Sequence, residues 1–546
     1  MRDQSLKKYP HLFEPFLIPP VKLKNRMTMA PLFTAYANPD GTVSSLMLDH
    51  YGEVARGGAS MVVVANASVD PSGTLSRFSL RADEDRFLPR LSKLAQTIQK
   101  EGAAAVLQVN HGGRFANGEV VYAPSVAAIG DVNIGGFYRT VLKNLDLHEQ
   151  LTVFSEILHR LTGRPKEMSV ADIRRIITAY VEAATRAKKA GFDMVEIHGG
   201  TGYLPVQFLS ARTNLRNDEY GGSLENRMRF ALELTKAVKK AVGADFPVGY
   251  RFLADEWLPP DGFSLGEAKV LAERLARLGV AYLSVTAGTY ESFCDPEIIE
   301  KSHEPGYMVY LAHEVKEVVK IPVVATGRIT TPELAEEILK ARKADLIGLA
   351  RPLFADPEWL LKTEKGEEET IVLCKDCGTC FRATIAERPV VCPLWDKTKL
   401  IKRKELVKEM RNPRKKLLIA MDGSESATLG AAYAAEMLAN RKDVCITLVH
   451  IQTEESIKNE KQIEDAFGIA RSFLTKAGIP DEAISVQVRK KRIGVARDIL
   501  DEIKEGGYGT VVVGRRGISK AQQFLFGSVS NKIVQNAKDC AVWVVD

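Results

Sequence analysis

Four cysteines have a spacing that could bind a metal cluster. Cys374, Cys377, Cys380 and Cys392 form the pattern C-x2-C-x2-C-x11-C, and the chain of 546 residues has only seven cysteines. Thiolates are soft ligands that favour zinc and iron–sulfur clusters. Structural zinc sites usually use two separated C-x2-C pairs, whereas a tight trio and one remote Cys followed by Pro suit a [4Fe–4S] cube better. We therefore expect a [4Fe–4S] cluster, with zinc or a redox dithiol as the alternatives.

Polar residues that could bind a cofactor lie at the ends of a series of short apolar runs. These residues are Gln108, His198, Arg251, Arg328 and Arg351. The runs are nearly continuous, as in parallel strands that are buried on both faces, and helical patterns separate them, one of them at 169–189. The runs lie at 26–31, 59–67, 103–110, 192–199, 247–252, 281–288, 321–327 and 345–351.

These eight βα units predict a (β/α)8 barrel. Its active site would lie at the C-terminal ends of the strands, where the five polar residues cluster. A second alternation follows, with strand candidates at 415–422, 444–451, 484–490, 510–516 and 541–546. Five strands joined by αβ crossovers predict a small doubly wound sheet. The predicted fold class is therefore α/β, with an N-terminal TIM barrel, an iron–sulfur segment and a C-terminal doubly wound domain.

Changes in pattern divide the chain into four segments. They are a barrel at 1–365, an iron–sulfur segment at 366–396, a basic linker at 397–413 and a second domain at 414–546. From Lys397 to Lys416, ten Lys or Arg accompany two Glu. We interpret this run as a solvated linker rather than a binding site for nucleic acid or anionic lipid. Residues 131–167 are too long for a plain βα loop, and the pattern leaves their role open.

Composition narrows the class of protein. The chain is 45% hydrophobic and 26% charged, which disfavours disorder, collagen and disulfide scaffolds. The first twenty residues have no apolar stretch before a cleavage site, and no run of about 18 apolar residues indicates a membrane span. The formal net charge of +6 is small for this length. We expect a cytoplasmic protein without a membrane span or a nucleic-acid partner.

Several motifs of the barrel resemble the old yellow enzyme family, the flavin-dependent NAD(P)H oxidoreductases. The longest is VEIHGGTGYLPVQFLSARTNLRNDEYGGSLENRMRF at 195–230. The others are NRMTMAPL (25–32), QVNHGGR (108–114), ATGRI (325–329) and LARPLFADPEW (349–359). The cysteine segment after the eighth strand is similar to that of the iron–sulfur branch, which includes 2,4-dienoyl-CoA reductase, 2-enoate reductase and trimethylamine dehydrogenase. The resemblance covers about residues 10 to 395.

The resemblance implies FMN as the cofactor. Barrels bind phosphate on the loops after strands seven and eight, where Gly327, Arg328 and Arg351 lie. Gln108 would bond the flavin pyrimidine edge, and Arg251 would place positive charge near N1 and O2 of the flavin. The remaining cofactor-binding positions that match the family are Pro31, Leu32 and Ala65, at the isoalloxazine ring, and Ala350.

The resemblance also assigns catalytic roles. Hydride transfer from the flavin to an activated alkene leaves an enolate that must be protonated, and Tyr203 matches the proton donor. His198 and Thr201 would orient the substrate carbonyl, but Thr201 replaces the His or Asn of many relatives. This weaker clamp disfavours small free enones as substrates and favours a thioester substrate. Phe33 occupies a position where relatives often have Cys or Thr. His303 is either a second acid or an exposed loop residue.

The expected function is reduction of a conjugated C=C bond in an enoyl or dienoyl thioester or an enoate. A cluster beside FMN implies that electrons move singly. No G-x-G-x-x-G motif follows Cys392, so we expect electrons from NAD(P)H or from a separate flavoprotein, ferredoxin or FAD subunit. One alternative is amine dehydrogenation or demethylation, with Tyr36 and Trp257 as members of a cation-binding cage. Another is a redox- and ATP-sensing stress protein without alkene turnover.

The C-terminal segment resembles the universal stress protein family in its ATP-binding branch. GRRGISKAQQFLFGS (514–528) has the pattern G-x2-G-x9-G-S, and LLIAMDGSESA lies at 417–427. Glycine turns let the backbone approach phosphates, and a helix N-terminus favours anions. The resemblance implies that ATP or AMP contacts Asp422, Gly514, Gly517, Gly527 and Ser528. The alternative is a dimerisation module with a vestigial site, and pairing through the last strand would make the protein a homo-oligomer.

Overall fold

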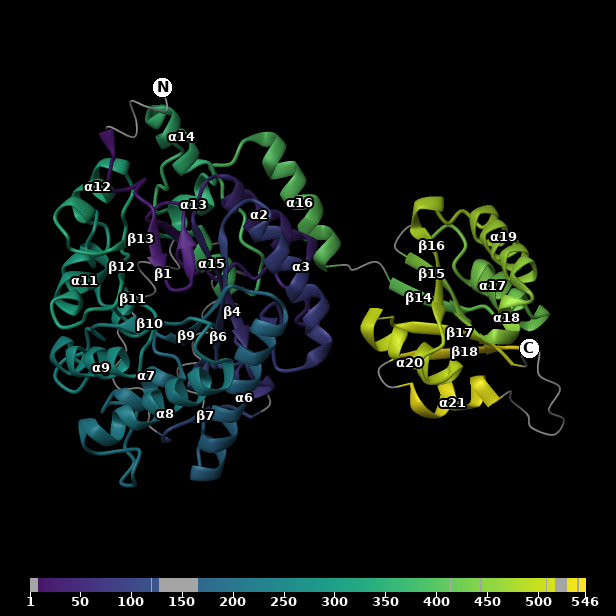
Figure 1. The fold of residues 1–546 in the computed structure, drawn as a ribbon, viewed down its shortest axis with the longest axis horizontal. Helices are drawn as coiled ribbons and strands as arrows, with labels where there is room; N and C mark the ends of the chain where they lie inside the picture. The colour runs from purple at the N-terminus through teal and green to yellow at the C-terminus, as the bar shows by residue number, and fades with distance from the viewer. Residues whose placement is uncertain are drawn as a thin grey trace. The chain divides into compact units, whose positions relative to one another are not determined.

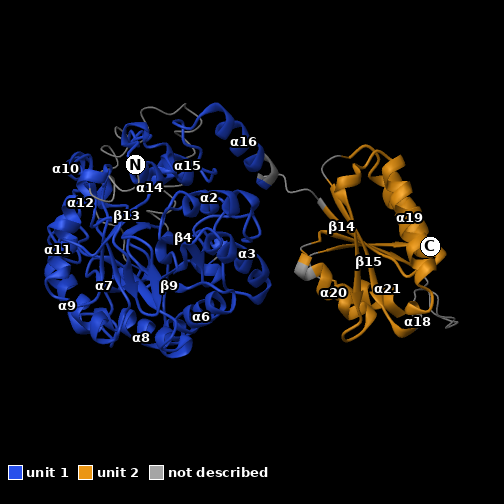
Figure 2. Ribbon diagram, turned by 45° about the horizontal axis from the view of Figure 1, so that its top comes forward, with its two compact units in different colours: residues 1–410 blue, residues 411–546 orange. Residues whose placement is uncertain are grey.

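A computed structural model describes most of the chain in two compact units. The described residues are 8–118, 120–126, 165–411, 415–441, 444–506, 508–515, 528–537 and 540–546. Unit 1 comprises residues 1–410 and unit 2 comprises residues 411–546 (Figure 2). Among the helices of the described ranges, none is long and apolar enough to cross a membrane.

Unit 1 is a closed parallel barrel, which confirms the predicted fold. Its strands are β3 (Met27–Met29), β4 (Met61–Ser68), β6 (Ala104–Asn110), β9 (Met194–Gly199), β10 (Val248–Leu253), β11 (Leu283–Thr286), β12 (Val323–Ala325) and β13 (Leu346–Leu349). They are hydrogen-bonded in the order β3-β13-β12-β11-β10-β9-β6-β4, and β3 pairs with β4 to close the ring. Most of the strand residues are buried, because helices cover the outer face of the barrel (Figure 1).

The covering helices follow the strands along the chain. They are α2 (Ser45–Arg56), α3 (Leu88–Gln99), α6 (Val170–Lys189), α8 (Leu224–Val242), α9 (Leu265–Arg277), α11 (Val309–Lys316), α12 (Pro332–Lys340) and α14 (Trp359–Lys365). Helix α6 shows why they form where they do. Ser169 and Asp172 make a reciprocal capping box at its start, and its buried face includes Ile173 and Ile176.

The strand register places the predicted polar residues side by side. Gln108 of β6 lies opposite Glu196 of β9, and Arg251 of β10 lies between His198 and Ser284 of its two neighbours. Paired residues of neighbouring parallel strands point to the same face of the sheet. Their side chains therefore form one contiguous group within the barrel.

The basic run predicted as a linker is largely a helix of unit 1. Helix α16 (Lys397–Arg411) places Arg403 against α2, where its side chain has 0% exposure. The guanidinium donates to the Glu53 carboxylate at 2.7 Å and lies 3.1 Å from that of Asp49. Lys399 contacts Glu53 at 2.8 Å. The charge run differs from a solvated linker because α2 supplies acidic partners that only the folded chain brings near.

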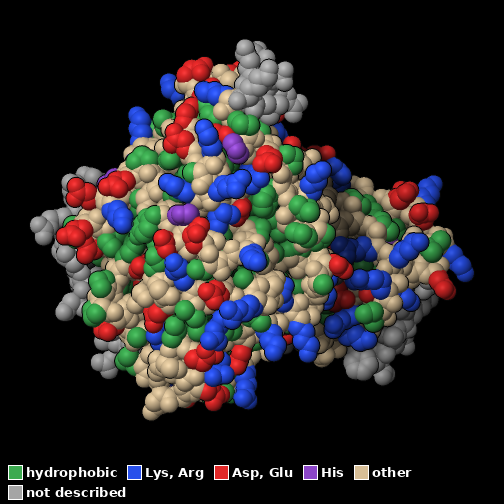
Figure 3. All heavy atoms as spheres, turned by 60° about the vertical axis from the view of Figure 1, so that its left-hand side comes forward, with side chains coloured by type: hydrophobic (Ala, Val, Ile, Leu, Met, Phe, Trp, Pro, Cys, Tyr) green, Lys and Arg blue, Asp and Glu red, His purple; other side chains and the backbone are tan. Residues whose placement is uncertain are grey.

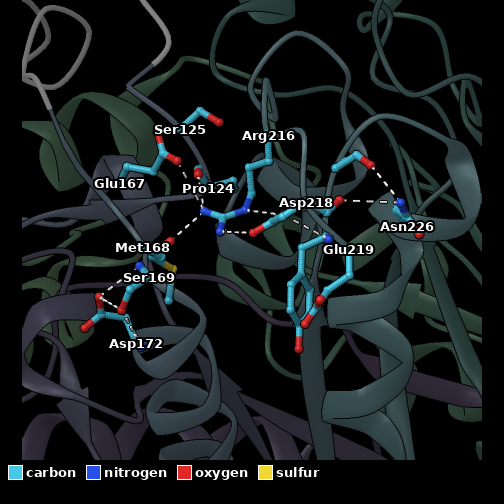
Figure 4. Close-up of polar contacts among 12 residues, drawn as sticks. Pro124, Ser125, Glu167, Met168, Ser169, Asp172, Arg216, Asp218, Glu219 and Asn226 are labelled. Carbon is cyan, nitrogen blue, oxygen red and sulfur yellow. Dashed lines mark hydrogen bonds and ion pairs between the residues drawn. The ribbon is translucent and has the colours of Figure 1, made fainter.

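Arg216, within the longest family motif, makes structural contacts that connect loop segments. Its guanidinium donates to the backbone carbonyls of Pro124 and Met168 at 2.8 and 2.5 Å, and it binds Asp218 through two nitrogens (Figure 4). These carbonyls follow β7 (Tyr122–Ala123) and β8 (Lys166–Glu167), which pair in a small parallel sheet. Most of the 131–167 insertion lies outside the described residues, and Arg216 joins the two strands that flank it.

Unit 2 is a five-stranded parallel sheet, as predicted. The strands are β14 (Lys415–Ala420), β15 (Val444–Gln452), β16 (Ile484–Lys490), β17 (Thr510–Gly514) and β18 (Ala541–Val545), in the order β16-β15-β14-β17-β18. The helices are α17 (Glu425–Met437), α18 (Glu454–Ile457), α19 (Glu460–Lys476), α20 (Val495–Gly506) and α21 (Ser528–Asn536). Two apolar clusters, one with α17 and α19 and one with α20 and α21, cover the two faces. The unit is therefore doubly wound.

The surface of unit 1 carries charges of both signs. Acidic and basic side chains are interspersed over the face drawn in Figure 3. Several of them form ion pairs between helices, such as Lys269 with Glu314 at 2.7 Å and Arg274 with Glu225 at 2.5 Å. This mixture agrees with the small net charge of the chain.

Candidate functional site

The buried side-chain amide of Gln108 has one polar atom that makes no hydrogen bond. Gln108 has 0% exposure and donates through Nε2 to the Glu196 carboxylate at 2.7 Å. Tyr282 donates to the other oxygen of that carboxylate at 2.9 Å, and burial raises the pKa of Glu196. Gln108 Oε1 is buried and has no hydrogen-bond partner. A buried acceptor without a donor is costly, so this oxygen fits an N–H of a bound flavin pyrimidine edge.

Arg251 and His198 lie side by side in the register of β10 and β9. Arg251 donates to Ser284 Oγ at 2.7 Å, and burial lowers the pKa of this guanidinium. Burial, and then the positive charge of Arg251, lower the pKa of His198 to about 3. His198 is therefore neutral at pH 7. Its Nδ1 accepts from the Gly200 backbone N–H at 3.2 Å, which leaves the ring proton on Nε2 as a donor.

Tyr203 lies beside the His198 ring. It precedes α7 (Leu204–Leu209), it is 3% exposed, and the two rings meet edge to face with centroids 4.9 Å apart. Its hydroxyl is 2.8 Å from that of Tyr290, which follows β11. Thr201 occupies the turn between His198 and Tyr203 with a left-handed φ of 61°. The sequence reasoning missed Tyr290, although its position directly after the sixth strand, in GTYES, could have indicated it.

The other residues predicted to contact the flavin ring also lie at this end of the barrel. Pro31, Leu32 and Phe33 follow β3 directly and are half-buried. Ala65 lies within β4, and its N–H donates to the Tyr51 hydroxyl at 3.0 Å. Phe33 packs against the core of the barrel. These residues surround the strand ends that carry the polar group.

A pocket opens after β12 and β13, as expected for a phosphate site. Its volume of about 150 Å³ is roughly ten times what one water requires. Its lining includes Gly327, Arg328, Ala350, Arg351 and Cys374. Gly327 has a φ of 106°, and a Cβ there would lie 2.6 Å from the side chain of Met308. Glycine therefore lets the backbone form the pocket wall, with two guanidinium groups beside it.

The two arginines of this pocket converge on one carboxylate. Arg328 and Arg351 both form ion pairs with Asp376, which comes from the cysteine segment. His303, weighed above as a second acid, is exposed and lies 3.1 Å from the same carboxylate, whereas Tyr290 is the residue that contacts Tyr203. Two guanidinium groups that bind one anion together have the donor set that a phosphate dianion requires. The sequence reasoning missed Asp376 as well.

One of the four spaced cysteines, Cys374, lines this pocket. Cys374 and Cys380 are half-buried, Cys377 is exposed and Cys392 is buried. Burial, and then the neighbouring Cys392 and Cys374, raise the pKa of the Cys380 thiol to about 12. In the described parts of the chain, no three His, Cys, Asp or Glu side chains are arranged around a single metal ion. Four thiols form a soft donor set of the kind that iron–sulfur clusters and zinc use.

The two aromatic residues considered for a cation cage lie in different clusters. Tyr36 is 1% exposed, packs on His50 and Phe354, and donates to the Val390 carbonyl. Trp257 packs on Phe293 and Tyr307. These contacts do not bring the two rings together as one cage.

Unit 2 brings its candidate residues to the strand ends. Asp422 follows β14 and accepts from the Ser424 N–H at 3.0 Å, in the turn that leads into α17. Gly514 ends β17, where a Cβ would lie 2.8 Å from the carbonyl carbon of Ser426. The order of the strands reverses between β14 and β17, which is where doubly wound sheets bind ligands. Ser528 begins α21, and Gly517 and Gly527 lie outside the described residues.

Comparison with known families gives two matches. Residues 11–370 match the NADH:flavin oxidoreductase / NADH oxidase family, and residues 413–546 match the universal stress protein family. The barrel is 39% identical over 372 residues to the NADH oxidase of Thermoanaerobacter brockii, covering 68% of this chain and 53% of that protein. It is 38% identical over 383 residues to the metal reductase of Desulforamulus reducens, covering 70% and 53%. The chain thus spans about half the length of these two relatives.

A solved structure shows a similar fold over nearly the whole chain. A complex of 2-naphthoyl-CoA reductase with 2-naphthoyl-CoA aligns with a TM-score of 0.64 and 24% identity, covering 94% of this chain and 75% of that one.

Proposed function

This chain belongs to the NADH:flavin oxidoreductase / NADH oxidase family, and it is therefore a flavin-dependent oxidoreductase. From that premise we propose that it reduces a conjugated C=C bond of an enoyl or dienoyl thioester or an enoate. The observation that carries this proposal is the pairing of a neutral His198, with its Nε2 proton, and the buried hydroxyl of Tyr203 beside it. Reduction of such a bond needs a donor at the carbonyl oxygen and a proton for the α-carbon.

FMN is the proposed cofactor, and the described residues fit its parts. Gln108 Oε1 would accept from the pyrimidine edge, Arg251 would place positive charge beside it, and Arg328 and Arg351 would hold the phosphate. When bound, the flavin supplies the hydride. His198 Nε2–H donates to the substrate carbonyl as negative charge develops on its oxygen, and Tyr203 gives its hydroxyl proton to the α-carbon.

A thioester or carboxylate substrate is favoured over a small enone. Thr201 offers one short hydroxyl, held by a left-handed backbone, where a second imidazole or amide would grip a free carbonyl more firmly. A substrate that carries its own binding group, such as a CoA moiety, depends less on that clamp, because remote binding energy helps to orient the reacting part.

Cys374, Cys377, Cys380 and Cys392 are the proposed ligands of a [4Fe–4S] cluster, whose chemistry is one-electron transfer. Cys374 lines the proposed phosphate pocket, which supports a role next to the flavin. We propose that electrons come from NAD(P)H or from a separate flavoprotein, ferredoxin or FAD subunit. Rapid flavin reduction by NADH or NADPH alone would argue against the need for a partner protein.

Unit 2 is proposed to bind ATP or AMP at Asp422, Gly514, Gly517, Gly527 and Ser528 and to pair with a second copy through β18. The position of Asp422 and Gly514 at the switch point of the sheet supports the nucleotide site. Equilibrium dialysis with ATP and AMP, with Asp422→Ala as the comparison, would test it.

The barrel function has a direct test. The chain is purified without oxygen, its absorption spectrum is recorded, and iron and acid-labile sulfide are measured. Reduced protein is then mixed with enoyl-CoA thioesters and enoates, and the return of the oxidised flavin spectrum is followed. We expect reoxidation that depends on the alkene, with formation of the saturated product. Protein that binds flavin but is reoxidised by no alkene would contradict the proposal.

A further inference from the structure

The proposed proton donor is remote from solvent. Tyr203 is 3% exposed and packs with Leu75 and Phe115 in a small apolar cluster. After it gives a proton to the substrate, its phenolate has to be stabilised and then protonated again before the next turnover. A buried phenolate is costly unless a donor lies within hydrogen-bond distance.

Tyr290 is placed to be that donor. Its hydroxyl is 2.8 Å from the hydroxyl of Tyr203, and 87 residues separate the two in sequence. The rings meet edge to face at 6.1 Å, and the ring of Tyr290 meets that of Phe115 in the same way at 5.0 Å. Unlike Tyr203, Tyr290 is only half-buried. Tyr203 is thus enclosed, whereas the Tyr290 side chain is partly exposed to solvent.

The loop that carries Tyr290 is held by its own hydrogen bonds. The Thr289 N–H donates to Ser292 Oγ at 2.7 Å, and Cys294 Sγ lies 3.3 Å from the Tyr290 carbonyl. A Cβ at Gly288 would lie 2.7 Å from the ring of Phe293, so the backbone just before the loop packs closely against this ring. These contacts fix the backbone on both sides of Tyr290, and its ring packs against those of Phe115 and Tyr203.

We propose that Tyr290 relays protons to Tyr203, an inference that rests on the proposed alkene reduction. In this step the Tyr203 O–H bond breaks and a C–H bond forms at the α-carbon of the enolate. The Tyr290 O–H bond breaks as its proton passes to the Tyr203 oxygen, and a solvent water restores the proton of Tyr290. The proton count balances, and the relay itself transfers no electrons.

Tyr290→Phe tests the relay because it keeps the ring contacts with Phe115 and Tyr203 and removes only the hydroxyl. The pre-reduced holoenzyme is mixed with crotonyl-CoA, or with another thioester that the wild type reduces, in mixtures of H2O and D2O. We expect reoxidation to slow by about 10- to 100-fold, a modest share of what general acid catalysis contributes. Tyr310→Phe is the matched control, since it removes the hydroxyl of an exposed tyrosine on α11, and its rate should equal that of the wild type.

The dependence of the rate on the fraction of D2O separates a relay from a packing role. Two protons in motion give a curved plot for the wild type, and Tyr290→Phe should give a straight line. In a Tyr203→Phe background, Tyr290→Phe should have no further effect, because the two hydroxyls act as one unit. Equal rates and equally curved plots for the wild type and Tyr290→Phe would overturn the relay. A wild type that reduces no alkene would overturn the proposed function, and the relay with it.

Discussion

Replacing Asp376 by Asn should tighten FMN binding. The Asp376 carboxylate lies against Arg328 and Arg351, the two guanidinium groups proposed to hold the FMN phosphate. A carboxylate and a phosphate that need the same N–H donors compete for them, and their like charges repel each other. The neutral amide of Asn releases the donors and removes the repulsion.

The size of the effect follows from the exposure of the three side chains. A hydrogen bond to a charged group contributes about 1.5–3 kcal/mol, and Asp376 makes such contacts with two arginines. The side chains of Asp376, Arg328 and Arg351 are 12%, 19% and 36% exposed, so solvent weakens the pairs. We expect a net gain of about 2 kcal/mol, which corresponds to about 30-fold tighter binding.

The assay is a titration of the flavin-free protein, followed by the quenching of flavin fluorescence. Riboflavin has no phosphate, so its affinity should be the same for wild type and Asp376→Asn. Glu387→Gln is the matched variant, because Glu387 lies in the same segment but contacts Asn117 and Arg77 instead. An FMN affinity that is unchanged or weaker in Asp376→Asn would refute the competition and would show that Asp376 orients the arginines.

Three further outcomes follow from the described contacts. Arg216→Ala should lower the free energy of unfolding of unit 1 by about 2–3 kcal/mol, because it leaves the buried carbonyls of Pro124 and Met168 without their donor and removes the partner of the half-exposed Asp218 carboxylate. A variant as stable as the wild type in urea would contradict this. An unfolded imidazole binds a proton near pH 6.5 but His198 only near 3, so its contribution to stability is complete above pH 6.5 and is lost as the pH falls. Stability should thus drop by roughly 2 kcal/mol more between pH 7 and 5 in the wild type than in His198→Asn. Cys392→Ser should lose iron and acid-labile sulfide while riboflavin binding persists; full iron content would remove Cys392 from the ligand set.

Local sequence patterns were sufficient to predict the architecture. Parallel strands that are buried on both faces must be apolar throughout, so runs such as 59–67 and 103–110 predicted strands β4 and β6. The helical pattern at 169–189 predicted α6 in the same way. Polar residues at the ends of such runs had to gather at one rim, because all the strands of a parallel barrel end on the same side. These patterns involve only residues that are neighbours in sequence.

Contacts between distant segments depended on the tertiary structure. The partner of Gln108 is 88 residues away and that of Tyr203 is 87 residues away, and both were set by strand register and loop path. The segment that forms helix α16 was predicted to be a linker, because the acidic residues of α2 that pair with its basic side chains are about 350 residues earlier in the chain. Sequence thus determined which elements form and where chemistry gathers, since those follow from local periodicity. Only the closed barrel decided which side chains meet, because that depends on the relative placement of elements far apart in the chain.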